Sequence, residues 1–129
     1  MIDHVSISVR DLDRAARFYQ AVLGTIGYKK LRDEPHTVAF GKTYPEFWIN
    51  RRRGMAPLDR DSGSHVAVRA ASIEAVDGFH AAALAAGGDC DGAPGPRPEY
   101  SPDYYAAFIR DPEGNRIEAV TFQKIQEQE

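Results

Sequence analysis

The sequence contains an internal repeat whose two copies lie 61 positions apart. His4 opens the run 4–9 and His65 opens the run 65–70, and in each run apolar residues alternate with other residues. Such alternation predicts a β-strand that buries one face and presents the other. The same spacing matches further residues in the segments that follow the two runs: Phe18 with Phe79, and Gly27 with Gly88. These matches at one uninterrupted spacing indicate a duplicated unit.

The first copy predicts one helix followed by three short strands. Apolar residues at helical spacing cover 12–23, and Asp11 stands at the N-cap position of this helix. Strands are expected near 28–32, 37–41 and 46–51, because turn-forming residues separate these segments. The first copy is therefore read as a βαβββ unit.

The second copy repeats this order with one interruption. Ser72 is the N-cap candidate of a helix that ends at the glycine pair 87–88. The stretch 92–98 holds three prolines in five residues, which predicts an irregular insertion. Strands are expected over 104–109 and 116–122, on either side of a strong turn signal.

Together the two copies predict an α+β fold. Two tandem βαβββ modules form a cupped mixed sheet with the helices outside, because a single module cannot bury the second face of its own sheet. We place module 1 at about 1–53, a linker at 54–63 and module 2 at about 64–122. The two modules make one domain over 1–122, and a polar tail follows at 123–129.

The composition narrows the functional classes. A formal net charge of −3 gives no reason to expect a nucleic-acid partner, and no stretch approaches the roughly 20 apolar residues of a membrane span. The single Cys90 excludes an intrachain disulfide and any multi-cysteine zinc site. The first residues lack the basic and apolar regions of a signal peptide. We therefore expect a cytoplasmic protein that acts on a small-molecule substrate.

Three side chains point to a metal site. Glu118 lies within an apolar strand, where an unpaired carboxylate is costly. His4 and His65 lie on the strand faces opposite the apolar ones, so we expect them to line the inside of the cup. If the modules face each other, two imidazoles and one carboxylate converge as a facial triad for one divalent ion. Without a thiolate ligand, iron, manganese, zinc, nickel and cobalt are all candidates.

At this point the chain resembles a known family. The segments 4–11, 18–24, 65–68 and 111–118 are similar to motifs of the vicinal oxygen chelate superfamily. This group includes glyoxalases, extradiol dioxygenases and the fosfomycin- and bleomycin-resistance proteins. The resemblance covers residues 1–122. It implies two βαβββ modules, a metal between them, and a substrate that chelates the metal through vicinal oxygens. It also allows a homodimer.

The resemblance assigns the ligands position by position. His4, His65 and Glu118 match the ligand positions of the family. Glyoxalases usually carry a fourth ligand in the last strand of module 1. A gapless spacing of 68 places Asn50 opposite Glu118, and a turn shorter by two places Trp48 there. Neither is a usual ligand, so a two-histidine, one-glutamate set is closer to the dioxygenase and fosfomycin-type members.

Several other residues are candidates for the site. Glu46 shares the parity of Asn50 and is a further ligand candidate if the alignment slips. One of the adjacent Tyr104 and Tyr105 is expected to face the helix and the other the cup, and Tyr105 is our candidate catalytic residue beside Glu118. The residues expected to contact substrate are Trp48, Asn50, Tyr100 and Tyr105. His36 is read as a turn residue and His80 as a solvated helix residue.

Three functions are compatible with these features. The leading hypothesis is a small metal-dependent enzyme in which the ion binds vicinal oxygens and stabilises an oxyanion. Isomerisation, epoxide opening and oxygen insertion all fit, so a lyase or isomerase, a dioxygenase and a transferase stay open. The second is a metal-free module that sequesters a ligand, as bleomycin-resistance proteins do. The third is a partner-binding domain that uses 51–53 and 92–98 as its surface.

Overall fold

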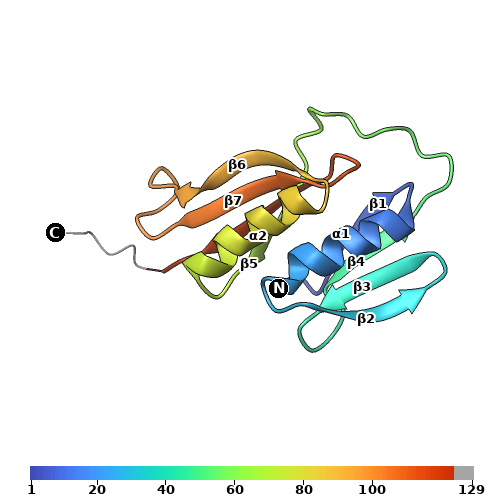
Figure 1. The fold of residues 1–129 in the computed structure, drawn as a ribbon, viewed down its shortest axis with the longest axis horizontal. Helices are drawn as coiled ribbons and strands as arrows, with labels where there is room; N and C mark the ends of the chain where they lie inside the picture. The colour runs from blue at the N-terminus through green and yellow to red at the C-terminus, as the bar shows by residue number, and fades with distance from the viewer. Residues whose placement is uncertain (124–129) are drawn as a thin grey trace.

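The computed structural model describes residues 1–123 as two βαβββ modules, each with one helix and one four-stranded sheet (Figure 1). The helices and strands follow in chain order: β1 (Val5–Val9), α1 (Leu12–Gly24), β2 (Lys29–Glu34), β3 (Thr37–Gly41), β4 (Phe47–Arg51), β5 (His65–Arg69), α2 (Ile73–Ala85), β6 (Asp89–Pro96), β7 (Tyr105–Arg110) and β8 (Arg116–Thr121). The expected α+β fold of two tandem modules is confirmed. Apart from Gln123, the expected polar tail lies outside the described residues.

The two modules have the same topology. The strand order is β1-β4-β3-β2 in module 1 and β5-β8-β7-β6 in module 2, with β1 parallel to β4 and β5 parallel to β8. Helix α2 begins and ends 61 positions after α1. The expected N-caps also match, because Asp11 accepts a hydrogen bond from the backbone N–H of Arg14, and Ser72 accepts one from that of Ala75. The repeat seen in the sequence is therefore a repeat of structure.

One expectation about module 2 is wrong. The stretch 92–98 was expected to be irregular, yet β6 runs through it as far as Pro96. This strand lies at the edge of its sheet and pairs only with β7. Within residues 1–123 its other edge has no partner strand, so a proline there costs no hydrogen bond between strands. Its register shifts twice, between Cys90 and Gly92 and between Gly92 and Gly95. An edge strand with bulges thus accommodates a sequence that a central strand would not.

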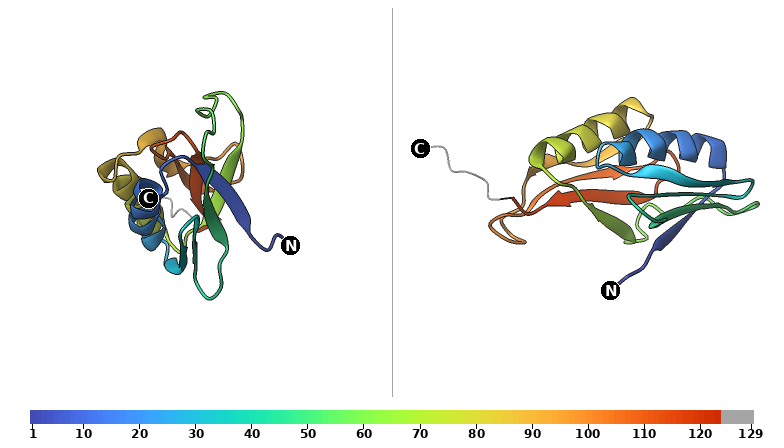
Figure 2. Two further views of the ribbon diagram at one scale, coloured as in Figure 1. Left: turned by 90° about the vertical axis from the view of Figure 1, so that its right-hand side faces the viewer. Right: turned by 90° about the horizontal axis from the view of Figure 1, so that it is seen from below.

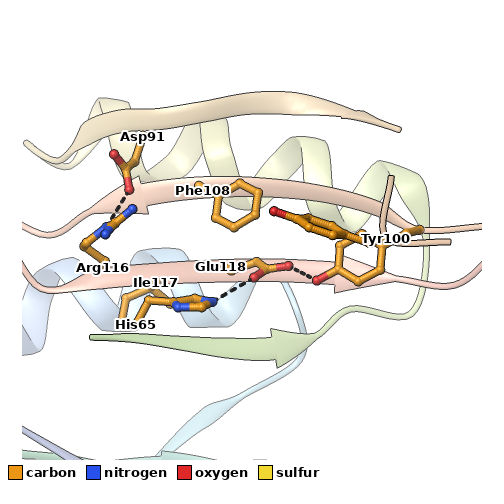
Figure 3. Close-up of a pocket in the computed structure, with 8 residues that line it drawn as sticks. His65, Asp91, Tyr100, Phe108, Arg116, Ile117 and Glu118 are labelled. Atoms are coloured by element: carbon orange, nitrogen blue, oxygen red, sulfur yellow. Dashed lines mark hydrogen bonds and ion pairs between the residues drawn. The ribbon is translucent and has the colours of Figure 1, made fainter. Parts of the chain in front are cut away.

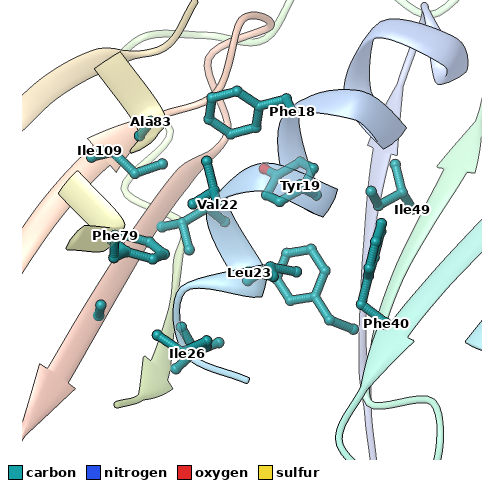
Figure 4. Close-up of a cluster of buried hydrophobic side chains, with 14 of the residues drawn as sticks. Phe18, Tyr19, Val22, Leu23, Ile26, Phe40, Ile49, Phe79, Ala83 and Ile109 are labelled. Atoms are coloured by element: carbon teal, nitrogen blue, oxygen red, sulfur yellow. The ribbon is translucent and has the colours of Figure 1, made fainter. Parts of the chain in front are cut away.

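Both helices cover the same side of the two sheets (Figure 2). The hydrophobic core fills the space between the helices and the sheets, and α1 packs against α2 (Figure 4). The core side chains in this layer are largely aromatic or branched: Phe18, Tyr19, Val22, Leu23, Ile26, Phe40, Ile49, Phe79 and Ile109. The opposite side of the sheets has no such cover within residues 1–123. No helix in this range is long and apolar enough to cross a membrane.

A buried carboxylate joins the two modules. Glu113 lies in the turn between β7 and β8, and its side chain is 3% exposed. It accepts hydrogen bonds from the backbone N–H groups of Arg10, at 2.7 Å, and Asp11, at 2.8 Å, just before α1 begins. A negative charge is favourable at a helix N-terminus. This contact and the packing of the helices place the modules side by side.

Candidate functional site

The parallel pairing of β5 with β8 brings His65 and Glu118 together. In this register Glu118 pairs with Ala67, two residues after His65 on the same face. The Glu118 side chain is 3% exposed, whereas that of His65 is 46% exposed. A distance of 3.2 Å separates His65 Nε2 from Glu118 Oε1. The pair therefore places a buried carboxylate oxygen beside an accessible imidazole nitrogen.

Tyr104 holds the second oxygen of the same carboxylate. Its hydroxyl group donates a hydrogen bond to Glu118 Oε2. Burial, this hydrogen bond and the charge of Glu118 all raise the pKa of Tyr104. The phenol consequently stays protonated and acts as a donor. The Glu118 carboxylate is thus oriented from both sides, by His65 and by Tyr104.

A cavity of about 500 Å³ lies next to this pair, on the face of the sheet away from α2 (Figure 3). Its walls combine aromatic rings with charged groups, and they comprise His65, Asp91, Tyr100, Tyr104, Phe108, Arg116, Ile117 and Glu118. The expected substrate residue Tyr100 is among them. Phe108, Arg116 and Asp91 were not singled out from the sequence. Arg116 shares the parity of Glu118 on β8, and this signal would have identified it.

A shared carboxylate stands at one end of the cavity. Asp91 Oδ2 accepts a hydrogen bond from Arg116 Nε at 2.9 Å, and its Oδ1 accepts one from Arg110 Nε at 3.3 Å. The Asp91 side chain is 17% exposed. These three residues link β6, β7 and β8 across the sheet.

His4 does not join His65 and Glu118 within one chain. It precedes β1 in module 1, its side chain is 53% exposed, and its Nδ1 lies 2.8 Å from Asp3 Oδ1. Within residues 1–123, no three His, Cys, Asp or Glu side chains form a group that could hold one ion. The convergence of these three side chains was conditional on the modules facing each other, and within one chain the modules lie side by side with both helices on one side (Figure 2).

In module 1 the expected residue Trp48 lies beside His4, and Asn50 is hydrogen-bonded within its own sheet. The Trp48 ring lies edge-on to the His4 ring, with 6.3 Å between the ring centroids. Asn50 donates a hydrogen bond to Ser6 Oγ and accepts one from Thr37 Oγ1 at 2.7 Å. Each module thus carries its own group of candidate residues.

The strand register settles which residue of module 1 is equivalent to Glu118. Ser6 pairs with Trp48 as Ala67 pairs with Glu118, and Ser6 and Ala67 are 61 positions apart. Trp48, rather than Asn50, therefore occupies the equivalent position, and its indole is not a metal ligand. Glu46 accepts a hydrogen bond from the hydroxyl group of Tyr28 at 3.1 Å.

Tyr105 faces away from the cavity, which corrects the choice made from the sequence. Its hydroxyl group donates a hydrogen bond to Asp77 Oδ1 on α2 at 2.7 Å. Burial and this contact raise the pKa of Tyr105 to about 12. Its neighbour Tyr104, which lies just before β7, is the tyrosine that reaches Glu118. As expected, one of the two tyrosines faces the helix. It is Tyr105, and Tyr104 is the one that lies in the site.

Comparisons with solved structures find the same architecture in other proteins. A glyoxalase/bleomycin resistance protein from Albidiferax ferrireducens T118 is 34% identical, with a TM-score of 0.81, covering 92% of this chain and 96% of the other. A glyoxalase/bleomycin resistance protein/dioxygenase family enzyme from Burkholderia phytofirmans PsJN is 20% identical, with a TM-score of 0.70 and coverage of 95% and 98%. A mutant glyoxalase I from Zea mays is 22% identical, with a TM-score of 0.70, covering 91% of this chain and 45% of that chain. The last two share the fold.

A comparison with curated protein sequences finds no significant match. The sequence profile of the Glyoxalase/Bleomycin resistance protein/Dioxygenase superfamily matches residues 1–119, which is nearly the whole chain. The repeated βαβββ modules agree with the architecture of the solved structures above. The chain therefore belongs to the glyoxalase/bleomycin resistance protein/dioxygenase superfamily.

Proposed function

We propose that the protein is a metal-dependent enzyme that binds a substrate through two vicinal oxygens. The observation that carries this proposal is the buried Glu118 carboxylate, which is 3% exposed and lies beside His65 at the wall of an open cavity. A carboxylate so far from water is costly unless a positive charge compensates it. A divalent ion would supply that charge from the cavity side.

The donor atoms present suit such an ion. One imidazole nitrogen and one carboxylate oxygen lie 3.2 Å apart, and both belong to the ligand types that transition metals accept. Tyr104 would keep the other carboxylate oxygen out of the first coordination shell by holding it in a hydrogen bond. Two ligands alone leave the site incomplete, so a third donor is required.

We propose that a second copy of the chain contributes the third ligand, its own His4. Each module carries half of the expected set: His65 and Glu118 in module 2, and His4 with Trp48 in module 1. The sheet face of module 2 that bears His65 is open, and His4 is 53% exposed. Module 1 of a second copy placed against this face would restore the facing arrangement that one chain lacks.

The residues of this chain then have distinct tasks. His65 and Glu118 would hold the ion, Tyr104 would orient Glu118, and the rings of Tyr100 and Phe108 would bind the substrate body and exclude water. When bound there, an ion would supply Lewis-acid stabilisation of negative charge on a substrate oxygen. Isomerase or lyase, dioxygenase and transferase reactions all use this binding mode, and the proposal covers the binding mode common to them.

Metal content tests the proposal. The protein is purified without a histidine tag and its metals are quantified by mass spectrometry, beside His65→Ala, Glu118→Gln and His4→Ala. His36→Ala is the matched control, because His36 lies away from the cavity with its Nδ1 2.7 Å from Arg51. We expect about one transition-metal ion per chain in the wild type and in the control. Each of the other three variants should lose most of it.

The opposite result would redirect the function. A wild-type protein that is metal-free, and that takes up no divalent ion on dialysis, contradicts the enzyme proposal. The aromatic cavity would then serve a module that sequesters its ligand without a metal, and this second reading predicts that Glu118→Gln leaves ligand affinity unchanged.

A further inference from the structure

We infer that Arg116 binds an oxyanionic group of the substrate, a carboxylate or a phosphate, which the substrate carries on a planar apolar body. This inference rests on the proposed function, in which the cavity is the substrate site. Arg116 lies on β8 two residues before Glu118, on the same face, so their Cα atoms are about 7 Å apart. An anionic group bound by Arg116 would therefore be separated from the substrate oxygens beside Glu118 by about the width of one small ring.

The Arg116 guanidinium is anchored on one edge only. Its Nε donates to Asp91 Oδ2 at 2.9 Å, while within residues 1–123 its two terminal nitrogens have no hydrogen-bond partner. The side chain lines the cavity and is 33% exposed. The planar guanidinium presents parallel N–H groups whose spacing fits the oxygens of a carboxylate or phosphate. Asp91 therefore fixes the orientation of Arg116 and leaves donors directed at a ligand.

Asp91 does not cancel the charge at this end of the cavity. It is shared between Arg116 and Arg110, at 2.9 Å and 3.3 Å, so two guanidinium groups face one carboxylate. One positive charge is left in excess. The Asp91 and Arg110 side chains are only 17% and 18% exposed, and charges so sheltered from solvent are screened less than those on an open surface.

The other arginine near the cavity uses both terminal nitrogens in hydrogen bonds within its own module. The Arg97 guanidinium lies over the Phe108 ring, 5.5 Å from the ring centroid. Its terminal nitrogens donate to the backbone carbonyls of Ala93, at 2.6 Å, and Gly95, at 2.9 Å. Arg97 therefore binds the backbone of β6, and among the described residues Arg116 is the arginine that lines the cavity with unpaired terminal nitrogens.

The remaining walls define the body of the ligand. Phe108 lies between Arg116 at one end and Tyr100 at the other (Figure 3). Tyr100 and Tyr104 lie edge to face, with 5.0 Å between their ring centroids. Aromatic rings arranged in this way favour a flat apolar or aromatic body stacked along them. The cavity thus combines one anion-binding end with an aromatic wall.

Three probes that share one ring test the inference: benzoate, phenyl phosphate and the neutral benzamide. Each is titrated into the metal-free protein, prepared with a chelator, and followed by NMR at the side-chain N–H signals of arginine and at the aromatic signals. The decisive variant is Arg116→Gln. Arg110→Gln is the matched control, because Arg110 also pairs with Asp91 but does not line this cavity.

We expect benzoate or phenyl phosphate to bind the wild type at least about tenfold more tightly than benzamide, since a hydrogen bond to a charged group contributes this much. Arg116→Gln should lower that affinity to the level of benzamide, whereas Arg110→Gln, which removes the excess charge but no donor that lines the cavity, should lower it less. If both anions bind no better than benzamide, if neither binds saturably, or if the two variants behave alike, the inference is overturned.

The metal content of the same variants separates this inference from the proposed function. Arg116→Gln should hold as much metal as the wild type, because it removes no proposed ligand. A protein that binds the anion through Arg116 but takes up no metal supports the anion site and contradicts the enzyme proposal. A protein that binds the metal at His65 and Glu118, but whose anion affinity does not depend on Arg116, supports the enzyme proposal and contradicts the anion site.

Discussion

The Tyr104 hydroxyl donates its hydrogen bond to the oxygen of Glu118 that points away from His65. Glu118 is buried and therefore needs a partner for each oxygen. Because Tyr104 satisfies one of them, the other is presented to His65 and to the cavity. A tyrosine outside the proposed ligand set thus decides which Glu118 oxygen is available.

Tyr104→Phe should weaken metal binding without unfolding the protein. Phenylalanine retains the ring that packs against Tyr100 and Phe122, but it leaves Glu118 Oε2 without its donor. Losing a hydrogen bond that orients a ligand typically costs about 10- to 100-fold in metal affinity. The measurement is a competition titration with a chromogenic chelator. Tyr105→Phe is the control, since its hydroxyl group contacts Asp77 on α2, and equal affinities in the two variants would refute the role of Tyr104.

Glu113→Gln should destabilise the contact between the modules. The substitution removes the charge that accepts hydrogen bonds from the backbone of Arg10 and Asp11, at a position that is 3% exposed. We expect a loss of about 1–3 kcal/mol in the free energy of unfolding, measured by urea denaturation. Glu74→Gln, at an exposed residue in the first turn of α2, is the control. A loss no larger than that of the control would show that Glu113 does not hold the modules together.

Tyr19→Phe should lower the free energy of unfolding at neutral pH. It should also make that free energy fall less steeply at high pH than in the wild type. Tyr19 is fully buried and donates a hydrogen bond to Asp111 Oδ2 at 2.7 Å. Burial and the charge of Asp111 raise the pKa of Tyr19 above its value in the unfolded chain, which is about 10. Above pH 10 the unfolded chain loses this proton first, so the free energy of unfolding falls as pH rises.

The two effects in Tyr19→Phe are measured separately. At pH 7 the variant should lose about 1–3 kcal/mol, because Asp111 loses a donor in the core. Between about pH 9 and 11 its unfolding free energy should fall less steeply than that of the wild type, by the contribution of one titrating group. Urea denaturation across this range is the measurement, and parallel curves for the two proteins would refute the account of Tyr19.

Gly88→Ala should destabilise the second module. A Cβ atom at this position would lie 2.6 Å from the carbonyl oxygen of Arg110 and 2.8 Å from the ring of Phe18. Overpacking of this kind typically costs about 1–3 kcal/mol. Gly24→Ala is the matched control, since nothing lies within 4 Å of a Cβ there, and it should cause no loss. Thermal unfolding of both variants gives the comparison, and a Gly88→Ala protein as stable as the control would show that the backbone yields easily.

The local elements could be predicted from the sequence because each depends on neighbouring residues. The two helices and their caps at Asp11 and Ser72 follow from spacing and capping chemistry. The prediction missed β6, since prolines argue against a strand only where both edges must pair, and the position of a strand within its sheet is set by distant residues.

The candidate site was predictable only in part. Alternation placed His65 and Glu118 on one face, and the structure brings them to 3.2 Å. Alternation does not say how modules dock, which depends here on Glu113 reaching the start of α1. Alternation would also have favoured Tyr104 over Tyr105, because Tyr104 shares the parity of Phe108, which lines the cavity. Tyr105 instead shares the parity of the buried Ile109 and faces α2.

A mixing experiment tests most directly whether two copies of the chain share the metal site. His4→Ala and His65→Ala are each purified alone and are also co-expressed, and the mixed dimer is isolated for metal analysis. The account predicts that each variant alone holds little metal. The mixed dimer should recover half of the wild-type content, because one of its two sites then has His4 from one copy and His65 from the other. A mixed dimer as metal-poor as its parents, beside a metal-loaded wild type, would contradict the shared site.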